Sequence, residues 1–210
     1  AVPVELFVAG DALEKPWRKV PIWRDASYTV ASVGEGVAIR AVAEGASAVL
    51  ARGVEIDIET CPVIEWTWRV ESLPSEADLG SRRAEDVAAS LSLAFGDPGA
   101  FTNPNPVTTV RYVWATDGNA EGEVIDSPYF PGTIRSLVVE SGPARLGEWV
   151  TVRRDLLADF GAVFGGVPDE DLQVIALFTD SDHGEDRVEA FYREARMLCR
   201  EAPEEPTIFG

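Results

Sequence analysis

Hydrophobic and polar residues alternate along most of this chain with a period of two, which is the spacing of side chains on a β-strand. In residues 63–70, Ile64, Trp66 and Trp68 fall on one face and the polar residues between them fall on the other. This pattern is typical of a strand with one face in a core and the other in solvent. Turn-forming residues separate such segments. The predicted strands are residues 28–33, 37–43, 47–52, 63–70, 87–95, 108–114, 133–139, 149–154, 172–178 and 188–199.

One segment has the period of a helix. Leu156, Phe160 and Val163 share a helical face, and Asp155 can cap the first turn before the chain reaches a Gly-Gly pair. We therefore predict an all-β protein, a two-sheet antiparallel β-sandwich of the jelly-roll kind with one short helix near 155–164. Residues 1–200 are expected to form a single domain, and residues 201–210 an acidic, disordered C-terminal tail.

The net charge of the chain limits the classes of molecule that it is expected to bind. Its formal net charge is -18, so nucleic acid and anionic membrane surfaces would be repelled and are not expected as partners. Cations are the natural counter-charge, although a general adaptation to solubility or salt would give the same balance. The longest apolar runs have the length of strands, so we expect no membrane insertion. A chain that begins at Ala1 is expected to be periplasmic or secreted after removal of a signal peptide; trimming would look the same.

The two cysteines, Cys61 and Cys199, lie far apart and outside any Cys-x-x-Cys motif, which leaves zinc and thioredoxin-type chemistry without support. They form either a disulfide that closes a long loop or two buried thiols. The sequence leaves both alternatives open.

The most acidic loop follows the apolar strand at 172–178. Asp180 and Asp182, with nearby acidic residues and backbone carbonyls, could supply oxygen ligands to a structural calcium ion. Glu85 and Asp86 form a second acidic pair at the entrance of another strand and are candidate ligand-binding residues. His183, the only histidine, is a further candidate beside Asp182. The alternatives are turn capping with salt bridges to arginines, and a solvated histidine.

Aromatic residues suggest a different kind of site. Trp66 and Trp68 are expected in the core because they share the apolar face of one strand. Trp23, Tyr129 and Phe130 lie in proline-bounded segments and are the candidates for exposed aromatics that could stack on a sugar ring. Ordinary packing is the alternative interpretation.

Catalytic motifs are missing from the sequence. It contains no Gly-x-Ser-x-Gly elbow, no His-Glu-x-x-His and no phosphate-binding glycine loop before a helix. Both lysines lie in the N-terminal segment, so pyridoxal chemistry has no lysine in the core, and we expect no organic cofactor. Two enzyme alternatives stay open without a motif: a glycosidase with two carboxylates, and a lyase with Tyr112 or Tyr192 as base beside an arginine.

Short motifs run through the chain in a fixed order. They lie at residues 61–70, 85–89, 111–114, 138–142, 147–149, 154–155, 159–160, 164–165 and 179–182. In order and spacing they resemble the bacterial domain-of-unknown-function family 3047 (DUF3047), roughly over residues 28–198. The resemblance implies an exported, single-domain protein whose fold is similar to the galactose-binding-like jelly rolls of carbohydrate-binding modules. It implies no activity, because the family has none assigned.

Two places depart from the family's pattern. The family's acidic pair is usually Asp-Asp, followed by small residues and an arginine, whereas here it is Glu85-Asp86 with Ser90 in the arginine's place. The family's Thr-Asp-x-Asp-Asn-Thr-Gly loop keeps its aspartates as Asp180 and Asp182, but His183-Gly184 replaces Asn-Thr. If the two acidic groups form one site, that site has been altered in this protein.

The leading hypothesis is a secreted or periplasmic, non-catalytic binding protein whose partner is a glycan or another extracellular ligand. The first rival is a polysaccharide hydrolase or lyase that uses the acidic loop together with Glu85 and Asp86. The second rival is a structural or adhesion component of the cell envelope. A binding module predicts exposed aromatics at a shallow surface, an enzyme predicts facing carboxylates in a cleft, and an adhesin predicts a broad apolar patch.

Overall fold

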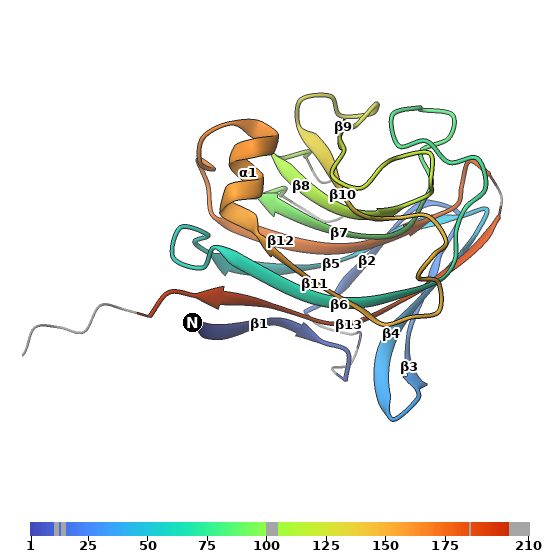
Figure 1. Cartoon of the computed structure of the whole chain (residues 1–210), viewed down its shortest axis with the longest axis horizontal. Coiled ribbons are helices and arrows are strands. Elements are labelled where there is room, and N and C mark those ends of the chain that lie inside the picture. The colour runs from blue at the N-terminus through green and yellow to red at the C-terminus, as the bar shows by residue number, and fades with distance from the viewer. Residues whose placement is uncertain (11–12, 14–15, 100–104, 185, 202–210) are drawn as a thin grey trace, which may run out of the picture.

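The computed structural model describes residues 1–10, 13, 16–99, 105–184 and 186–201, which form two stacked β-sheets and one helix. Figure 1 shows the sheets as two layers, with the helix at one end. The predicted tail at 201–210 lies outside the described residues from position 202 onward. Among the described residues, no helix has the length and apolar character needed to cross a bilayer.

The first sheet has six strands, in the order β11-β6-β13-β4-β3, with β1 also paired to β13. All of its pairs are antiparallel. Strand β13 is the longest and holds the sheet together, because it pairs with β6 along one side and with β4 and then β1 along the other. The strands are β1 (Val2–Val8), β3 (Ser27–Val33), β4 (Gly36–Glu44), β6 (Val63–Ser72), β11 (Val150–Asp155) and β13 (Arg187–Cys199).

The second sheet has seven strands, in the order β2-β5-β12-β7-β8-β10-β9. Its pairs are antiparallel except for β8 and β10, which run parallel, so the predicted sandwich is confirmed with one mixed sheet. The strands are β2 (Arg18–Trp23), β5 (Ser47–Ile56), β7 (Val87–Phe95), β8 (Thr109–Ala115), β9 (Val124–Asp126), β10 (Ile134–Ser141) and β12 (Leu172–Asp180).

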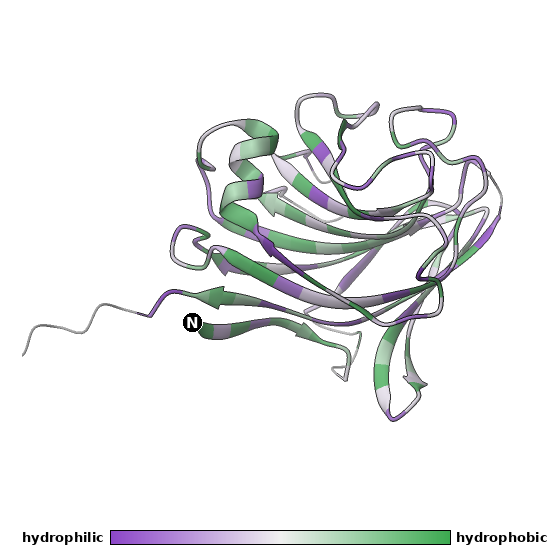
Figure 2. Cartoon of the chain, viewed as in Figure 1, coloured by the Kyte–Doolittle hydropathy of each residue, from purple (hydrophilic) through white to green (hydrophobic). Residues whose placement is uncertain are grey.

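Aromatic side chains fill the space between the sheets. Trp66 of β6 stacks on Tyr112 of β8 with ring centroids 4.9 Å apart, and Trp68 packs against Trp114 at 6.2 Å. All four side chains are buried, which confirms the core position predicted for the two tryptophans of β6. The order of residues along the strands explains this burial: Figure 2 shows hydrophobic and hydrophilic residues following one another at short intervals. Each sheet therefore has an apolar inner face, and burying the two inner faces against each other is the main force that holds the sandwich together.

Helix α1 (Leu156–Phe164) closes one end of the sandwich. It begins where predicted, because the carboxylate of Asp155 accepts a hydrogen bond from the backbone N–H of Ala158 at 2.9 Å. It ends at Gly165, whose φ of 82° is readily adopted only by glycine. Its apolar stripe packs on the core through Phe160, which meets Phe95 edge-on at 4.9 Å.

The sequence analysis missed three strands: β1, β2 and β9. Strand β2 contains Pro21, which cannot donate a ladder hydrogen bond and is tolerated because β2 is an edge strand. Strand β1 pairs only with the end of β13, and β9 has three residues. None of these segments carries a long alternation, so their pairing partners, more than their own pattern, make them strands.

Cys61 and Cys199 form a disulfide across 138 positions of sequence. The bond joins the loop before β6 to the last residue of β13, near the end of the sandwich that carries α1. Of the two alternatives that the sequence left open, the structure contains the bridge.

Candidate functional site: an acidic rim with three exposed aromatics

The two acidic groups of the sequence meet at the end of the sandwich opposite α1. Strands β12 and β7 are antiparallel neighbours, and Asp180 at the end of β12 pairs with Val87 at the start of β7. The segment that enters β7 therefore lies beside the loop that leaves β12. This register brings Asp86 to Asp180 although the two residues are far apart along the chain.

Four side chains form the centre of this site: Asp86, Asp180, Asp182 and His183. Each offers one ligand atom, and these atoms all lie within 4.8 Å of one another. Asp86 and Asp180 are buried, and the other two are partly exposed. We call this set the rim cluster.

Asp86 fixes the shape of the loop that follows β12. Its carboxylate accepts hydrogen bonds from the backbone N–H groups of His183, at 3.0 Å, and Gly184, at 2.7 Å. Ser47 of β5 donates its hydroxyl to Asp182 at 2.9 Å and anchors the other side of the loop. Two strands and the β7 entrance thus hold the rim cluster in place.

The hydrogen bonds around His183 determine where its protons lie. The Tyr129 hydroxyl has one proton, which it donates to the carbonyl oxygen of Arg82 at 2.8 Å. In the 2.9 Å contact between that hydroxyl and His183 Nε2, the histidine must therefore be the donor. Its Nδ1 lies 2.6 Å from Asp182 Oδ1 and 3.2 Å from Asp86 Oδ1. The imidazole and the two aspartates thus surround one small polar space, with two carboxylate oxygens on the same ring nitrogen.

Asp180 has an unusual protonation equilibrium. Its pKa is raised to about 9, chiefly by burial; the neighbouring carboxylates of Asp182 and Asp86 also raise it, and the hydrogen bond from the backbone N–H of Asp182 lowers it. The carboxyl group therefore holds a proton at neutral pH when no other cation is present. Three carboxyl groups share this space, and the proton on Asp180 reduces their combined negative charge.

One exposed aromatic ring, that of Tyr129, contacts the rim cluster. In the described part of the chain, the exposed aromatic side chains are Trp23, Tyr129 and Phe130, the three predicted from sequence. Tyr129 contacts His183 directly, and Phe130 follows it in the same loop. Trp23, at the end of β2, is the strand partner of Ser47, which bonds to Asp182.

A small hydrophobic cluster holds the loops of the site on the outer face of the seven-stranded sheet. It joins side chains of β7, β8, β9 and β10 to Leu79 of the segment before β7. Its buried members are Leu79, Val87, Val113, Ala115, Ile125 and Val138. Tyr129 is held at the edge of this layer by the guanidinium of Arg82, which lies 5.3 Å from its ring centroid.

Glu85 lies beside the rim cluster and has a different role from Asp86. It forms a buried ion pair with Arg111 of β8 at 2.8 Å, and Arg111 also donates to Ser136 at 2.8 Å. The sequence analysis kept salt bridges to arginines as an alternative for the acidic residues, but it did not identify Arg111 as the partner of Glu85. The available signal was one charged residue in the otherwise apolar strand β8, since a buried arginine requires a partner.

Three further candidates lie outside the cluster. Asp186 turns toward Ser75, from which it accepts both an N–H and an O–H. Tyr112 and Tyr192, considered as lyase bases, are fully buried in the core, where burial raises the pKa of both hydroxyls. Tyr112 donates to Asp159 and Tyr192 contacts Thr179, so both tyrosines serve packing and are closed to substrate.

Comparison with known proteins gives a family and distant structural similarities. Residues 15–196 match the family described as "Protein of unknown function (DUF3047)", which confirms the resemblance found in the sequence motifs. No curated protein matches the chain. Among solved structures, the chain is similar to the family 11 carbohydrate-binding module of the cellulosomal cellulase Lic26A-Cel5E of Clostridium thermocellum, with 7% identity, a TM-score of 0.49, and coverage of 97% of this chain and 98% of that chain. The xyloglucanase domain of NopAA from Sinorhizobium fredii has 9% identity, a TM-score of 0.47, and coverage of 88% and 93% respectively.

Proposed function

Since the chain belongs to DUF3047, a family of proteins of unknown function, its role has to be inferred from its own site, and we propose that it is an exported glycan-binding protein. The observation that carries the proposal is the position of the exposed aromatic side chains. Tyr129 contacts His183 of the rim cluster, and Phe130 is its exposed neighbour in the same loop. Trp23 is the strand partner of Ser47, which bonds to Asp182.

The chemistry of this rim suits a sugar. A pyranose presents C–H groups on its faces, which pack on aromatic rings, and hydroxyls at its edge, which donate to carboxylates. Tyr129 and Phe130 provide the rings. Asp182 is partly exposed, and since its Oδ1 is buried, the acceptor that it can offer is Oδ2, which also accepts from Ser47. The Tyr129 ring is held by Arg82 and by the contact to His183, so binding would cost little ordering of this side chain.

We infer that the rim cluster also binds a divalent cation. Calcium is the ion expected from Asp180 and Asp182, and the position of Asp86 adds a third carboxylate to them. A cation would replace the proton that Asp180 holds at neutral pH. Because the fourth ligand atom is an imidazole nitrogen, manganese or zinc would use all four side chains, whereas calcium would use the oxygens alone.

Export is supported by the disulfide between Cys61 and Cys199. Such bonds form and persist in oxidising compartments, including the bacterial periplasm and the extracellular space. We therefore place the protein outside the cytoplasm, where polysaccharides are available as ligands.

The glycan proposal is tested with a glycan array followed by calorimetry on the best ligand. The variants Tyr129→Ala and Phe130→Ala should each weaken binding by about tenfold, since one stacked ring contributes on the order of 1–2 kcal/mol. Val167→Ala removes an exposed apolar side chain elsewhere and should bind like the parent. An array without any bound glycan, or rim variants with unchanged affinity, would overturn the proposal.

The cation proposal is tested by thermal unfolding in chelator and after addition of calcium, manganese or zinc. Binding to the folded state alone should raise the melting temperature with increasing ion concentration. Asp182→Asn should abolish the increase, and Asp25→Asn, at an exposed carboxylate that pairs with Lys19, should keep it. Equal melting temperatures in chelator and in all three ions would remove the cation from the proposal.

Asp180 supports hydrolysis as a second candidate function. A carboxylic acid with a pKa of about 9 beside the carboxylates of Asp86 and Asp182 has the contrast in protonation on which glycosidase pairs depend. Asp180 is buried and these groups lie within 4.8 Å of one another, closer than in a glycosidase pair, so catalysis would require the loop to open. Release of reducing ends from a bound polysaccharide, and its loss in Asp180→Asn, would establish this activity. Binding without release would leave the protein a non-catalytic module.

A further inference from the structure

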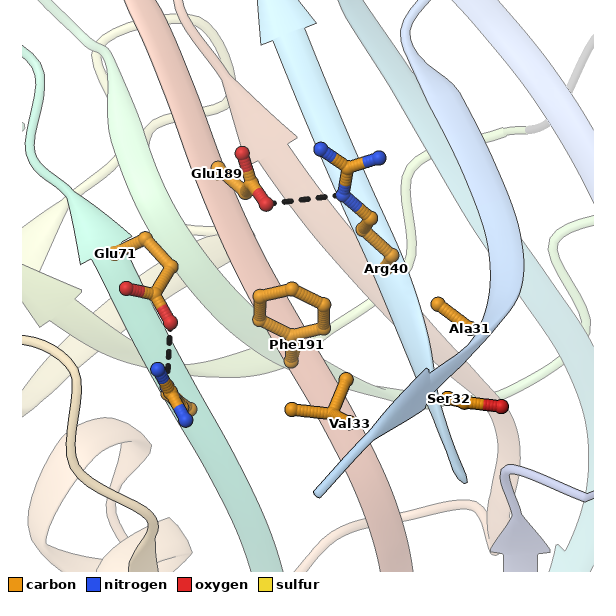
Figure 3. Close-up of a pocket in the computed structure, with 8 residues that line it drawn as sticks. Ala31, Ser32, Val33, Arg40, Glu71, Glu189 and Phe191 are labelled. Carbon is orange, nitrogen blue, oxygen red and sulfur yellow. Dashed lines mark hydrogen bonds and ion pairs between the residues drawn. The ribbon is translucent and has the colours of Figure 1, made fainter. Parts of the chain in front are cut away.

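A second polar surface lies on the outer face of the six-stranded sheet, in a different layer from the rim cluster. Here strands β3, β4, β13 and β6 form a shallow hollow of about 480 Å³, shown in Figure 3. This volume is in the range of small-molecule sites. The hollow is lined by Ala31, Ser32, Val33, Arg40, Arg69, Glu71, Glu189 and Phe191.

The register of the strands places an aromatic ring between two guanidinium groups. Phe191 of β13 pairs with Arg40 of β4 on one side and with Arg69 of β6 on the other. Side chains of directly opposed residues point to the same face of a sheet, so all three form one row across the floor of the hollow. Trp149 continues this surface, with its ring 6.3 Å from that of Phe191.

The arginines outnumber the acidic residues around this row. Glu189 accepts from Arg40 Nε at 2.9 Å and from an Nη of Arg187 at 2.8 Å, and Arg69 pairs with Glu71. Arg193 stacks over Trp149, with its guanidinium carbon 3.9 Å from the ring centroid.

Two arginine side chains of this surface have N–H donors without a hydrogen-bond partner among the described residues. Arg193 has no carboxylate partner among the described residues, and its Nε is buried without a hydrogen bond. Arg40 uses only its Nε in its contact with Glu189, which Figure 3 shows as a dashed line, and no hydrogen bond of its two terminal nitrogens is found among the described residues. The surface thus has a local excess of positive charge, in a chain whose net charge is -18.

We propose that this hollow binds a carboxylate-bearing sugar, a uronate unit of an acidic glycan, as a second ligand site separate from the rim cluster. The planar guanidinium of Arg40 offers two parallel N–H donors whose spacing matches the two oxygens of a carboxylate. A lysine ammonium offers no such pair. Phe191 and Val33 supply an apolar floor for the ring, and Glu71 supplies an acceptor for its hydroxyls. That the ligand is a sugar rests on the proposed glycan-binding function, whereas its negative charge rests on the arginines alone.

The test is calorimetric titration of the full chain with an oligouronate, and with the same oligosaccharide after its carboxyl groups have been reduced to alcohols. The parent protein should bind the oligouronate and bind the reduced form at least about tenfold more weakly, because it has lost the charge-assisted hydrogen bonds. Arg40→Gln should give a similar loss of about tenfold for the oligouronate and no change for the reduced form. Arg40→Lys, which keeps the charge without the paired donors, should also bind more weakly than the parent.

Two further variants separate this proposal from the rim. Arg153→Gln is the matched control, because Arg153 is an exposed arginine on the same sheet that approaches Glu65 only at 3.9 Å and does not line the hollow. It should bind like the parent, and Tyr129→Ala should leave oligouronate binding unchanged. Equal binding of the charged and reduced sugars, or oligouronate binding that survives Arg40→Gln, would overturn the hollow as an anion site. If Tyr129→Ala still lost binding to an array glycan, the glycan-binding function itself would stand.

Discussion

Replacing Asp180 by asparagine should change how the stability of this protein depends on pH. Asparagine has the shape of a protonated aspartate, and its side-chain oxygen can still accept the hydrogen bond that Asp182 N–H donates to Asp180 at 3.0 Å. The substitution therefore removes one titration and preserves the local contacts.

The magnitude follows from the raised pKa. Asp180 titrates near 3.8 when unfolded and near 9 in the folded protein. Because the folded state binds this proton more tightly than the unfolded state, the proton stabilises the folded protein. This stabilisation is complete below the unfolded pKa and is lost as pH rises toward the folded pKa. In that interval the slope is at most about 1.4 kcal/mol per pH unit. Between pH 5 and pH 8, the parent should lose up to about 4 kcal/mol relative to Asp180→Asn.

Urea unfolding at several pH values between 5 and 8, in the presence of chelator, measures this difference. Subtracting the curve of Asp180→Asn from that of the parent cancels the titration of every other group that the substitution leaves unperturbed. Asp25→Asn, at an exposed carboxylate, controls for the loss of one negative charge. If the unfolding free energies of parent and Asp180→Asn ran parallel within about 0.5 kcal/mol over this range, Asp180 would be ionised in the folded state and the reasoning would be wrong.

Two other changes test what holds the sandwich together. Replacing both Cys61 and Cys199 by serine opens a loop of 138 positions and should lower the unfolding free energy by about 5 kcal/mol in urea; a loss under about 1 kcal/mol would contradict the loop-entropy argument. Asp159 accepts hydrogen bonds from Tyr112 at 2.7 Å and from Arg154 at 2.8 and 2.6 Å. Asp159→Asn should therefore cost about 2–3 kcal/mol, and an unchanged urea midpoint would show that this network does not couple α1 to the core.

The predictions from sequence succeeded where a segment is determined by its own pattern. Strand β7 was predicted with its observed bounds because five apolar side chains alternate along it. Helix α1 was predicted because a cap, a stripe and a glycine stop occur in one short segment. Strand β2 was missed because Pro21 and its exposed side chains give no alternation.

The candidate site could be predicted only as separate residues. Asp86, Asp182, His183 and Tyr129 were each singled out for their side-chain chemistry. Their assembly depends on the register of β12 against β7 and on the loop that carries Tyr129 across to His183. The hollow on the other sheet was not predicted, although Glu189, Phe191 and Arg193 alternate along β13 and could have indicated one polar face.

The amino-acid sequence alone determined the helix, ten of the strands and the two apolar inner faces, since hydrophobic periodicity acts within one segment and burying those faces requires a second layer. The tertiary structure decided the order of the strands, the single parallel pair and the cysteine pairing. It also decided which charged groups share a desolvated space, and therefore the protonation of Asp180. Contacts between distant segments depend on how all strands pack at once, and no local pattern contains that information.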